Sequence, residues 1–182
     1  MAEEFKNNPK FEERALKYFD QADKNKDKLL TMPEVLEYAE TFKKLTSADD
    51  AKVESLREAL REFYGKCGVT VEGVKREKWV ENLSKCVVED LKKMKAGNKE
   101  ETMMYTFNRC WFDAFDLNED GVLSREEFKL YGKCFDMEEA NTAIFDFADT
   151  NKNGTLEWDE FFNLMCKFWI DLEQDDLYGG HI

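Results

Sequence analysis

The sequence has a single histidine, His181, and two prolines among its 182 residues. It has no glycine-rich phosphate loop and no His-Glu-x-x-His string, so no catalytic constellation is visible and we expect no enzyme. No run of about 18 apolar residues is present to span a membrane. The first ten residues do not resemble a secretory signal, and Ala2 stands where N-myristoylation needs glycine. We therefore expect a cytoplasmic protein without a membrane anchor.

Paired cysteines and an excess of basic charge are also missing. The five cysteines include no Cys-x-x-Cys pair, which favours reduced thiols, several of them buried. Lys and Arg number 27 against 40 Asp and Glu, giving a net charge of −13. This balance excludes a nucleic-acid binder that needs a basic face. The chain is 42% hydrophobic and 14% aromatic, which is too apolar for an acidic disordered chain. The acidity therefore belongs to a folded protein, which we expect to be a monomer.

A twelve-residue pattern occurs three times, beginning at Asp23, Asp116 and Asp149. Each copy has oxygen-bearing side chains at positions 1, 3, 5 and 12, and an aliphatic residue at position 8. This is the spacing of an EF-hand calcium loop, because Ca²⁺ takes six to eight oxygen ligands and the Glu at position 12 supplies two of them. Position 7 offers its main-chain carbonyl, and position 9 a side chain or a water.

The pattern predicts three Ca²⁺ sites. The predicted ligands are Asp23, Asn25, Asp27, Leu29, Thr31 and Glu34 in the first hand; Asp116, Asn118, Asp120, Val122, Ser124 and Glu127 in the third; and Asp149, Asn151, Asn153, Thr155, Glu157 and Glu160 in the fourth. Glycine is usual at position 6, where the backbone turns sharply. The first loop has Lys28 there, which predicts a weaker site.

Residues on either side of the loops support the pattern. An aromatic residue lies four positions before each loop, and an apolar residue follows position 12, at helical spacing for a shared core. These residues are Phe19, Phe112 and Phe145, and Val35, Phe128 and Phe161. Thr31 with Glu34, and Ser124 with Glu127, form capping-box patterns that start the helix leaving the loop. Pro33 falls in the first turn of such a helix, where its missing N–H does least harm.

EF-hands pair, so the first hand needs a partner. Residues 67–78 have suitable flanks in Phe63 and Trp79 and place Val74 at position 8, but Cys67 and Lys78 occupy positions 1 and 12. We interpret this stretch as a second hand that has lost its metal. Ser47 is the expected cap of the helix before it.

The predicted fold is therefore all-α. It has four EF-hands in two paired lobes packed into one compact globule, with short β-bridges between paired loops. The expected domains are residues 1–95 and residues 101–182, the latter with a short tail.

Competent first, third and fourth loops, a degenerate second and a length near 180 residues resemble the invertebrate sarcoplasmic calcium-binding proteins and their bacterial relatives. The tail Leu177-Tyr178-Gly179-Gly180 resembles the aromatic-glycine end of those proteins. The resemblance implies a Ca²⁺ buffer in the sarcoplasm, with Mg²⁺ exchanging in the same three sites.

Two other binding functions stay open. A Ca²⁺ sensor would open a Met-rich groove to a target helix, but the chain has 7 Met against 15 Phe. A luciferin carrier would hold a coelenterazine-type apolar ligand between aromatic-rich lobes. Photoproteins share the pattern of three competent loops but use several histidines, so the single His181 argues against photoprotein chemistry. Buffering is the main prediction.

Overall fold

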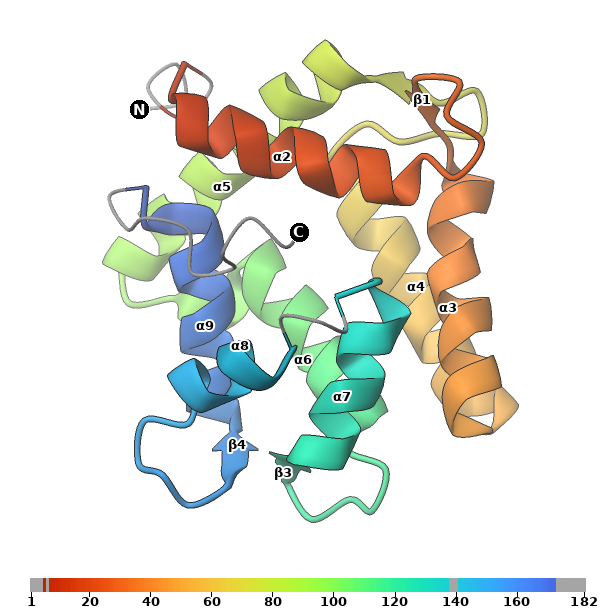
Figure 1. The fold of residues 1–182 in the computed structure, drawn as a ribbon. Helices are drawn as coiled ribbons and strands as arrows, with labels where there is room; N and C mark the ends of the chain where they lie inside the picture. Colours follow the sequence, from red (N-terminus) through yellow and green to blue (C-terminus); the bar gives the residue numbers. More distant parts are fainter. Residues whose placement is uncertain (1–4, 6, 138–140, 173–182) are drawn as a thin grey trace. The chain divides into compact units, whose positions relative to one another are not determined.

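The structure, a computed structural model, describes residues 5, 7–137 and 141–172. These residues are mostly helical and include two small antiparallel sheets, as the sequence predicts (Figure 1). The elements follow one another as α2 (Pro9–Ala22), β1 (Leu29–Leu30), α3 (Met32–Thr46), α4 (Asp50–Lys66), β2 (Val74–Lys75), α5 (Arg76–Lys95), the 3₁₀ helix η1 (Lys99–Glu101), α6 (Met103–Phe115), β3 (Val122–Ser124), α7 (Arg125–Cys134), α8 (Asn141–Ala148), β4 (Thr155–Glu157) and α9 (Trp158–Ile170). Among the described helices, none has the length and apolar character needed to cross a membrane.

The chain divides into two compact units. Unit 1 consists of Met1–Glu37 and Arg57–Phe107, and unit 2 of Tyr38–Leu56 and Asn108–Ile182. Both units are discontinuous in sequence, because α3 and α4 each contribute residues to both. The division into domains at residues 95 and 101 stays a prediction.

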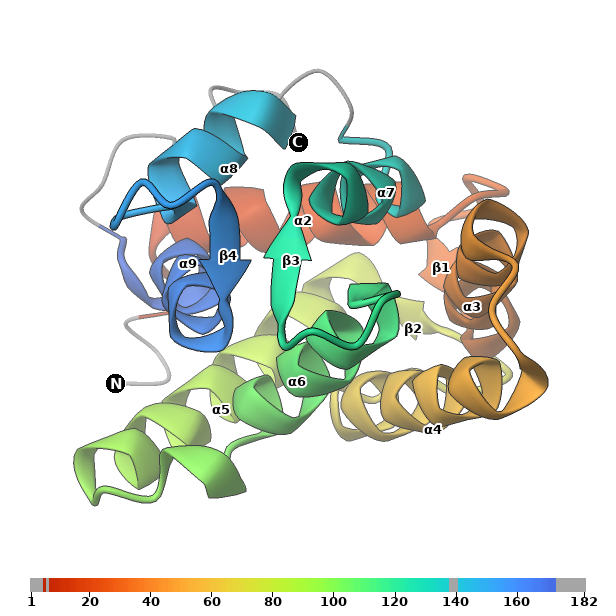
Figure 2. The same ribbon diagram turned by 90° about the horizontal axis from the view of Figure 1, so that it is seen from below.

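Each unit contains one pair of loops joined by a short antiparallel sheet. Leu30 pairs with Val74 in the sheet of unit 1, and Leu123 pairs with Leu156 in the sheet of unit 2. Figure 2 shows β3 and β4 side by side between the third and fourth loops. All four residues stand at position 8 of their loops and are buried, so the expected bridge through position 8 is confirmed in both pairs.

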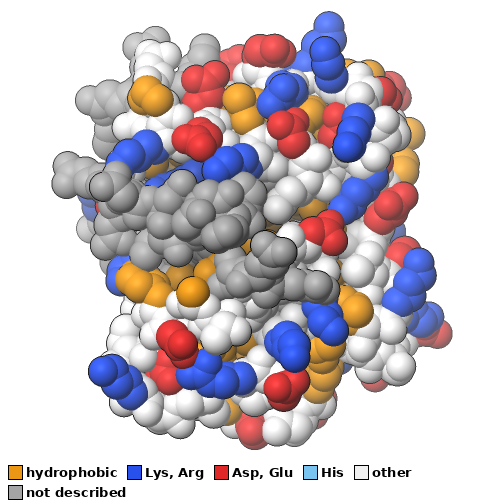
Figure 3. Space-filling view, in the orientation of Figure 1, with side chains coloured by type: hydrophobic (Ala, Val, Ile, Leu, Met, Phe, Trp, Pro, Cys, Tyr) orange, Lys and Arg blue, Asp and Glu red, His pale blue; other side chains and the backbone are white. Residues whose placement is uncertain are grey.

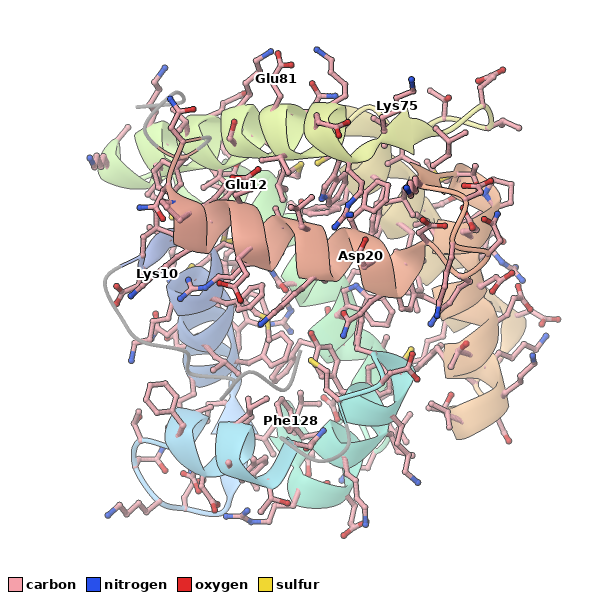
Figure 4. The ribbon with its side chains drawn as sticks, turned by 45° about the horizontal axis from the view of Figure 1, so that its top comes forward. Lys10, Glu12, Asp20, Lys75, Glu81 and Phe128 are labelled. Atoms are coloured by element: carbon pink, nitrogen blue, oxygen red, sulfur yellow. The ribbon has the colours of Figure 1, made fainter. Side chains whose placement is uncertain are left out.

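The core of unit 1 is aromatic and is built around Trp79. The Trp79 ring is fully buried and lies 5.6 Å from the ring of Tyr64, which it stacks against. Its indole N–H donates to the main-chain oxygen of Ala15 at 3.0 Å, so it ties α5 to α2. Figure 4 shows α2 running alongside α5, with Asp20 on α2 and Glu81 on the side of α5 away from α2. Trp79 thereby fixes the helix that enters the first loop.

The core of unit 2 contains the residues that flank its two calcium loops. Phe112, Phe145, Phe128 and Phe161 are each at most 1% exposed, as their helical spacing predicts. Figure 4 places Phe128 between α7 and α8, where its ring lies 5.6 Å from that of Phe145. In unit 1 the matching residues Phe19 and Val35 are also fully buried.

The helix α4 begins differently from the sequence prediction. Ser47 adopts a positive φ of 58° and donates its N–H to the main-chain oxygen of Lys43, so it ends α3 and does not cap α4. Asp49 caps α4 instead, because its side-chain oxygen accepts the N–H of Lys52 at 2.8 Å. Both residue types favour N-caps, so local pattern alone did not distinguish them.

The start of α6 is capped by a residue from another helix. Asp90 on α5 is 2% exposed and accepts the N–H groups of Met103 and Met104 at 2.9 and 2.7 Å. Burial raises the pKa of Asp90, while the two N–H groups oppose the rise because they stabilise the charged form. This contact fixes α6 to α5 within unit 1.

We predict that Asp90→Ala lowers the free energy of unfolding by about 2 kcal/mol, because it leaves two buried N–H groups without an acceptor. Asp90→Asn keeps one acceptor oxygen of similar shape and should cost about 1 kcal/mol. Urea unfolding of both variants measures the difference. An Asp90→Ala variant as stable as the wild type would show that the cap does not contribute.

Candidate metal centre

The three predicted calcium loops share one backbone conformation. Position 4 has a φ of 59° in every loop, at Lys26, Glu119 and Lys152. Position 6 is also left-handed, with φ of 84° at Gly121 and Gly154 and 70° at Lys28. The first loop therefore takes the EF-hand turn even though its position 6 carries a side chain.

The carboxylate at position 1 anchors each turn. Its Oδ2 accepts the N–H of position 6 at 2.9 Å in all three loops, from Lys28 to Asp23, from Gly121 to Asp116 and from Gly154 to Asp149. The three aspartates are between 4% and 7% exposed. Each one is thus held inside its loop.

The side chains at positions 3 and 5 each accept a hydrogen bond from the main-chain N–H two residues later. The side-chain oxygens of Asn25, Asn118 and Asn151 accept the N–H of position 5 at 2.8 to 3.2 Å. Those of Asp27, Asp120 and Asn153 accept the N–H of position 7 at 2.8 to 3.1 Å. These hydrogen bonds within the loop fix the side chains whose oxygens a cation would use.

The glutamate at position 12 reaches from the following helix back to the start of its loop. Glu127 Oε1 accepts the N–H of Leu117 at 2.9 Å, and its Oε2 accepts the N–H and hydroxyl of Ser124 at 2.8 and 2.7 Å. Glu160 likewise accepts the N–H of Thr150 at 3.0 Å on Oε1 and that of Glu157 at 3.1 Å on Oε2. Glu34 Oε1 accepts the N–H of Asn25, one position further along its loop, at 3.4 Å, and its Oε2 accepts the N–H and hydroxyl of Thr31 at 3.0 and 2.7 Å. The predicted capping box at Ser124 and Glu127 is confirmed. Both oxygens of each glutamate therefore face the loop interior.

The chemistry of these loops fits a hard divalent cation. In the first loop, Asp23 Oδ1 is buried and no donor in the described part of the chain reaches it. A buried carboxylate oxygen without a partner is costly, and a bound Ca²⁺ would satisfy it. The described residues contain no gathering of three or more His, Cys, Asp or Glu side chains that could hold a metal. The loops would instead complete their oxygen set with Asn side chains and main-chain carbonyls, as EF-hands do.

The fourth loop has only two carboxylates at its four side-chain positions, Asp149 and Glu160. Glu157 at position 9 could supply a third carboxylate, because its Oε1 lies next to the predicted ligand Asn153 and accepts a hydrogen bond from Asn153 Nδ2 at 3.3 Å. Thr150, which the sequence analysis did not single out, donates its hydroxyl to Glu160 Oε1 at 2.9 Å. Threonine at position 2 carries no recognisable signal in the loop pattern. The ligand assignments in all three loops remain predictions.

The second loop has apolar residues at positions 1, 3 and 5, where the other loops have oxygen-bearing side chains. Cys67 and Val69, at positions 1 and 3, are 0% and 2% exposed, while Val71 at position 5 is 72% exposed. Lys78 at position 12 pairs with Glu81 at 3.1 Å on the same helix. None of these side chains offers a carboxylate oxygen, so the geometry is consistent with the predicted loss of metal.

A lysine far away in sequence contacts the third loop. Lys52 on α4 donates to the main-chain oxygen of Asp116 at 3.2 Å and lies 3.4 Å from a carboxylate oxygen of Glu119. All three residues belong to unit 2. The contact joins residues 64 positions apart, so no spacing in the sequence indicated it.

The positive φ of Lys28 should lower the Ca²⁺ affinity of the first hand. A non-glycine residue in the left-handed region costs about 1 kcal/mol, so Lys28→Gly should tighten Ca²⁺ binding at this site by up to about fivefold. Gly121→Ala is the matched reverse change, because a Cβ at Gly121 meets nothing within 4 Å and only the backbone cost remains. It should weaken the third site by a similar factor. Calcium titrations of both variants test this, and unchanged affinity in Lys28→Gly would contradict it.

The surface around these elements mixes both signs of charge. Figure 3 shows Lys and Arg side chains interspersed with Asp and Glu on the face it draws. Ion pairs on this surface include Lys43 with Asp50 at 2.6 Å and Arg76 with Asp20 at 2.8 Å. The single histidine, His181, and the tail Leu177-Tyr178-Gly179-Gly180 lie outside the described residues.

Known proteins with similar sequences and structures indicate the family of this chain. A family model of an EF-hand domain pair matches residues 105–166. The solved structure of the Mg²⁺-loaded ctenophore photoprotein apo-berovin from Beroe abyssicola is 34% identical, with a TM-score of 0.77 and 86% of each chain covered. Obelin of Obelia geniculata is 27% identical over 96% of this chain and 92% of its own. The complex of apo-aequorin from Aequorea victoria with (S)-HM-daCTZ has the same fold, with a TM-score of 0.83, 21% identity, and 97% and 94% coverage.

These findings define a calcium-binding EF-hand protein. Within that superfamily, the chain belongs to the family of light-sensitive photoproteins that includes berovin. The predicted EF-hand superfamily is confirmed. The finer resemblance to sarcoplasmic calcium-binding proteins is corrected, because the relatives that match over most of the chain are photoproteins.

Proposed function

We propose that this protein holds an aromatic luciferin of the coelenterazine type and responds to Ca²⁺ through its first, third and fourth hands. Membership of the photoprotein family carries the proposal. The complex of apo-aequorin with (S)-HM-daCTZ, which shares the fold, supports it. Three loops with one common hydrogen-bond arrangement supply the calcium response. The luciferin-binding alternative is thereby favoured over a simple buffer.

A small cavity inside unit 1 does not serve as this ligand site. It is lined by residues including Phe63, Met103 and Phe107 and has a volume of about 30 Å³. That volume holds about one water molecule, and a luciferin is many times larger.

The loop glutamates are the part of the chain that would transmit metal binding. Ca²⁺ supplies a compact double positive charge that draws carboxylate oxygens together. Glu127 sits in the first turn of α7 and already contacts the N–H of Leu117 at the start of its loop. Any tightening of the loop around a cation would therefore move α7 relative to α6. Glu34 and Glu160 hold the same position at the starts of α3 and α9.

We propose that the three loops also bind Mg²⁺. All three Ca²⁺-binding loops of berovin bind Mg²⁺. Mg²⁺ is a hard cation that takes oxygen ligands, which the three predicted loops of this chain offer. We further propose that the protein works in the cytoplasm as a binding protein without catalytic turnover, since its five described cysteines are free thiols and the sequence offers no acid–base constellation.

The test is to incubate the purified full chain with coelenterazine in EDTA and a thiol reductant under air. Unbound compound is then removed by gel filtration, and absorbance measures what the protein retains. Retention near one molecule per chain supports the proposal. Injection of Ca²⁺ then distinguishes two forms of it, because light emission indicates a photoprotein and dark release indicates a carrier.

A triple variant provides the matched control. Glu34→Gln, Glu127→Gln and Glu160→Gln together should leave retention in EDTA unchanged and remove the Ca²⁺ response. If the wild type retains no coelenterazine at micromolar concentrations while still binding Ca²⁺, luciferin binding is wrong and the buffer interpretation returns.

A further inference from the structure

Two cysteines meet inside the hand that has no metal ligands. Cys67 follows α4 directly and stands at position 1 of the second loop, while Cys86 lies on α5. The Cys67 thiol donates a hydrogen bond to the Cys86 sulfur at 4.0 Å. Cys67 is buried and Cys86 is partly exposed. The two thiols therefore form a pair that solvent reaches through Cys86.

The position of Cys67 is fixed by a second contact with the same helix. Asn82, one turn before Cys86 on α5, donates its side-chain N–H to the main-chain oxygen of Cys67 at 3.0 Å. The next residue, Gly68, has a φ of 85°, and a Cβ there would lie 2.4 Å from Asn82 Nδ2. Only glycine allows this approach. The backbone at Cys67 is thus held against the face of α5 that carries Cys86.

We propose that Cys67 and Cys86 are a redox pair, which a peroxide converts into a disulfide that links the end of α4 to α5. In the three predicted calcium hands, the carboxylate at position 1 accepts the N–H of position 6, and the glutamate at position 12 ties the leaving helix to the start of the loop. The second hand has Cys67 and Lys78 at these positions. The disulfide would add a covalent link to the hydrogen bond that Asn82 donates to Cys67 in this hand.

The reaction begins at Cys86. The hydrogen bond from Cys67 lowers the pKa of the Cys86 thiol, and the cation of Lys66 acts in the same direction, while burial and the carboxylates of Asp90 and Glu89 oppose it. The Cys86 thiolate attacks one oxygen of the peroxide, the O–O bond breaks, and a sulfenic acid forms as hydroxide leaves. The hydroxide takes up the proton that Cys86 had released and becomes water.

The second step closes the bridge. Cys67 loses its proton and its sulfur attacks the sulfur of the Cys86 sulfenic acid. The S–S bond forms, the S–O bond breaks, and the oxygen leaves as water with that proton. Two thiols are oxidised by two electrons in total, and one hydrogen peroxide is reduced to two waters. The sulfurs must close from 4.0 Å to about 2.05 Å, which requires the side chains to rotate toward each other.

The experiment treats the folded full chain with one equivalent of hydrogen peroxide and counts free thiols. Intact mass and peptide mapping without reductant then locate the product. We expect the free thiols to fall from five to three, the mass to fall by two hydrogen atoms, and a peptide linked through Cys67 and Cys86. The oxidised protein should also unfold at a higher temperature than the reduced one.

Three variants make the result decisive. Cys67→Ser should stop at a Cys86 sulfenic acid that dimedone traps, and Cys86→Ser should form neither product. Cys110→Ser, which removes another partly exposed thiol, should still form the bridge. A disulfide that persists in Cys67→Ser or Cys86→Ser would overturn the proposal, as would wild-type Cys86 that oxidises to sulfinic acid with no linked peptide. None of these readouts depends on luciferin or Ca²⁺.

Discussion

Glu127→Gln should lower the Ca²⁺ affinity of the third hand by about a hundredfold or more. The change removes one negative charge and one of the two oxygens that Glu at position 12 gives to Ca²⁺. Losing a residue that only supports a metal ligand typically costs 10- to 100-fold, so losing a bidentate ligand should cost at least the upper end of that range. Isothermal calorimetry should show one binding event fewer in the micromolar range.

The neighbouring residue supplies a matched control. Glu126→Gln makes the same chemical change one position earlier, at an exposed side chain outside the ligand positions. It should leave the third site nearly unchanged. Equal losses in Glu126→Gln and Glu127→Gln would mean that general charge governs binding, and the assignment of position 12 would be wrong.

Trp79→Ala should lower the free energy of unfolding by about 3 to 5 kcal/mol. Trp79 is fully buried, stacks with Tyr64 and donates to the main chain of Ala15 on α2. Its removal leaves a large cavity between two helices of unit 1. Native domains are stable by about 5 to 15 kcal/mol, so this loss is a large share of the total.

Trp79→Phe separates packing from the hydrogen bond. It keeps an aromatic ring in the stack and loses the N–H, so it should cost about 1 to 2 kcal/mol, together with a smaller loss of packed volume. Urea denaturation with unchanged m-values gives both numbers. A cost for Trp79→Ala below that for Trp79→Phe would contradict the central place of this ring in unit 1.

The calcium loops were predictable because their chemistry is local. A ligand at positions 1, 3, 5 and 12 needs a particular residue type at each place, and the flanking Phe112 and Phe128 follow the helix period that buries them. The pairing of Leu123 with Leu156 follows from the same spacing. Even Lys28, which breaks the glycine preference, keeps the left-handed turn.

Contacts between distant segments were not predictable in this way. Asp90 caps α6 from α5, and Lys52 reaches the third loop from α4. Neither residue differs in type from many exposed charged residues, and only the fold brings them to their partners. The cysteines show the same limit, because Cys67 and Cys86 are 19 positions apart and carry no paired motif.

The family itself illustrates a further limit. Every EF-hand family shares the loop pattern, so the pattern of intact loops fitted both sarcoplasmic calcium-binding proteins and photoproteins. The single histidine favoured the former, whereas similarity over most of the chain shows the latter. The residues of the loops indicate metal binding, whereas similarity over the whole chain is needed to tell one EF-hand family from another.

The number of Ca²⁺ ions bound per chain tests the central account most directly. Native mass spectrometry of the full protein with saturating Ca²⁺ should show three ions bound, and the triple variant Glu34→Gln, Glu127→Gln and Glu160→Gln should show none at the same concentration. A fourth ion on the wild type would mean that the second hand binds metal despite Cys67 and Lys78. Two ions would mean that one of the three predicted loops is not a calcium site.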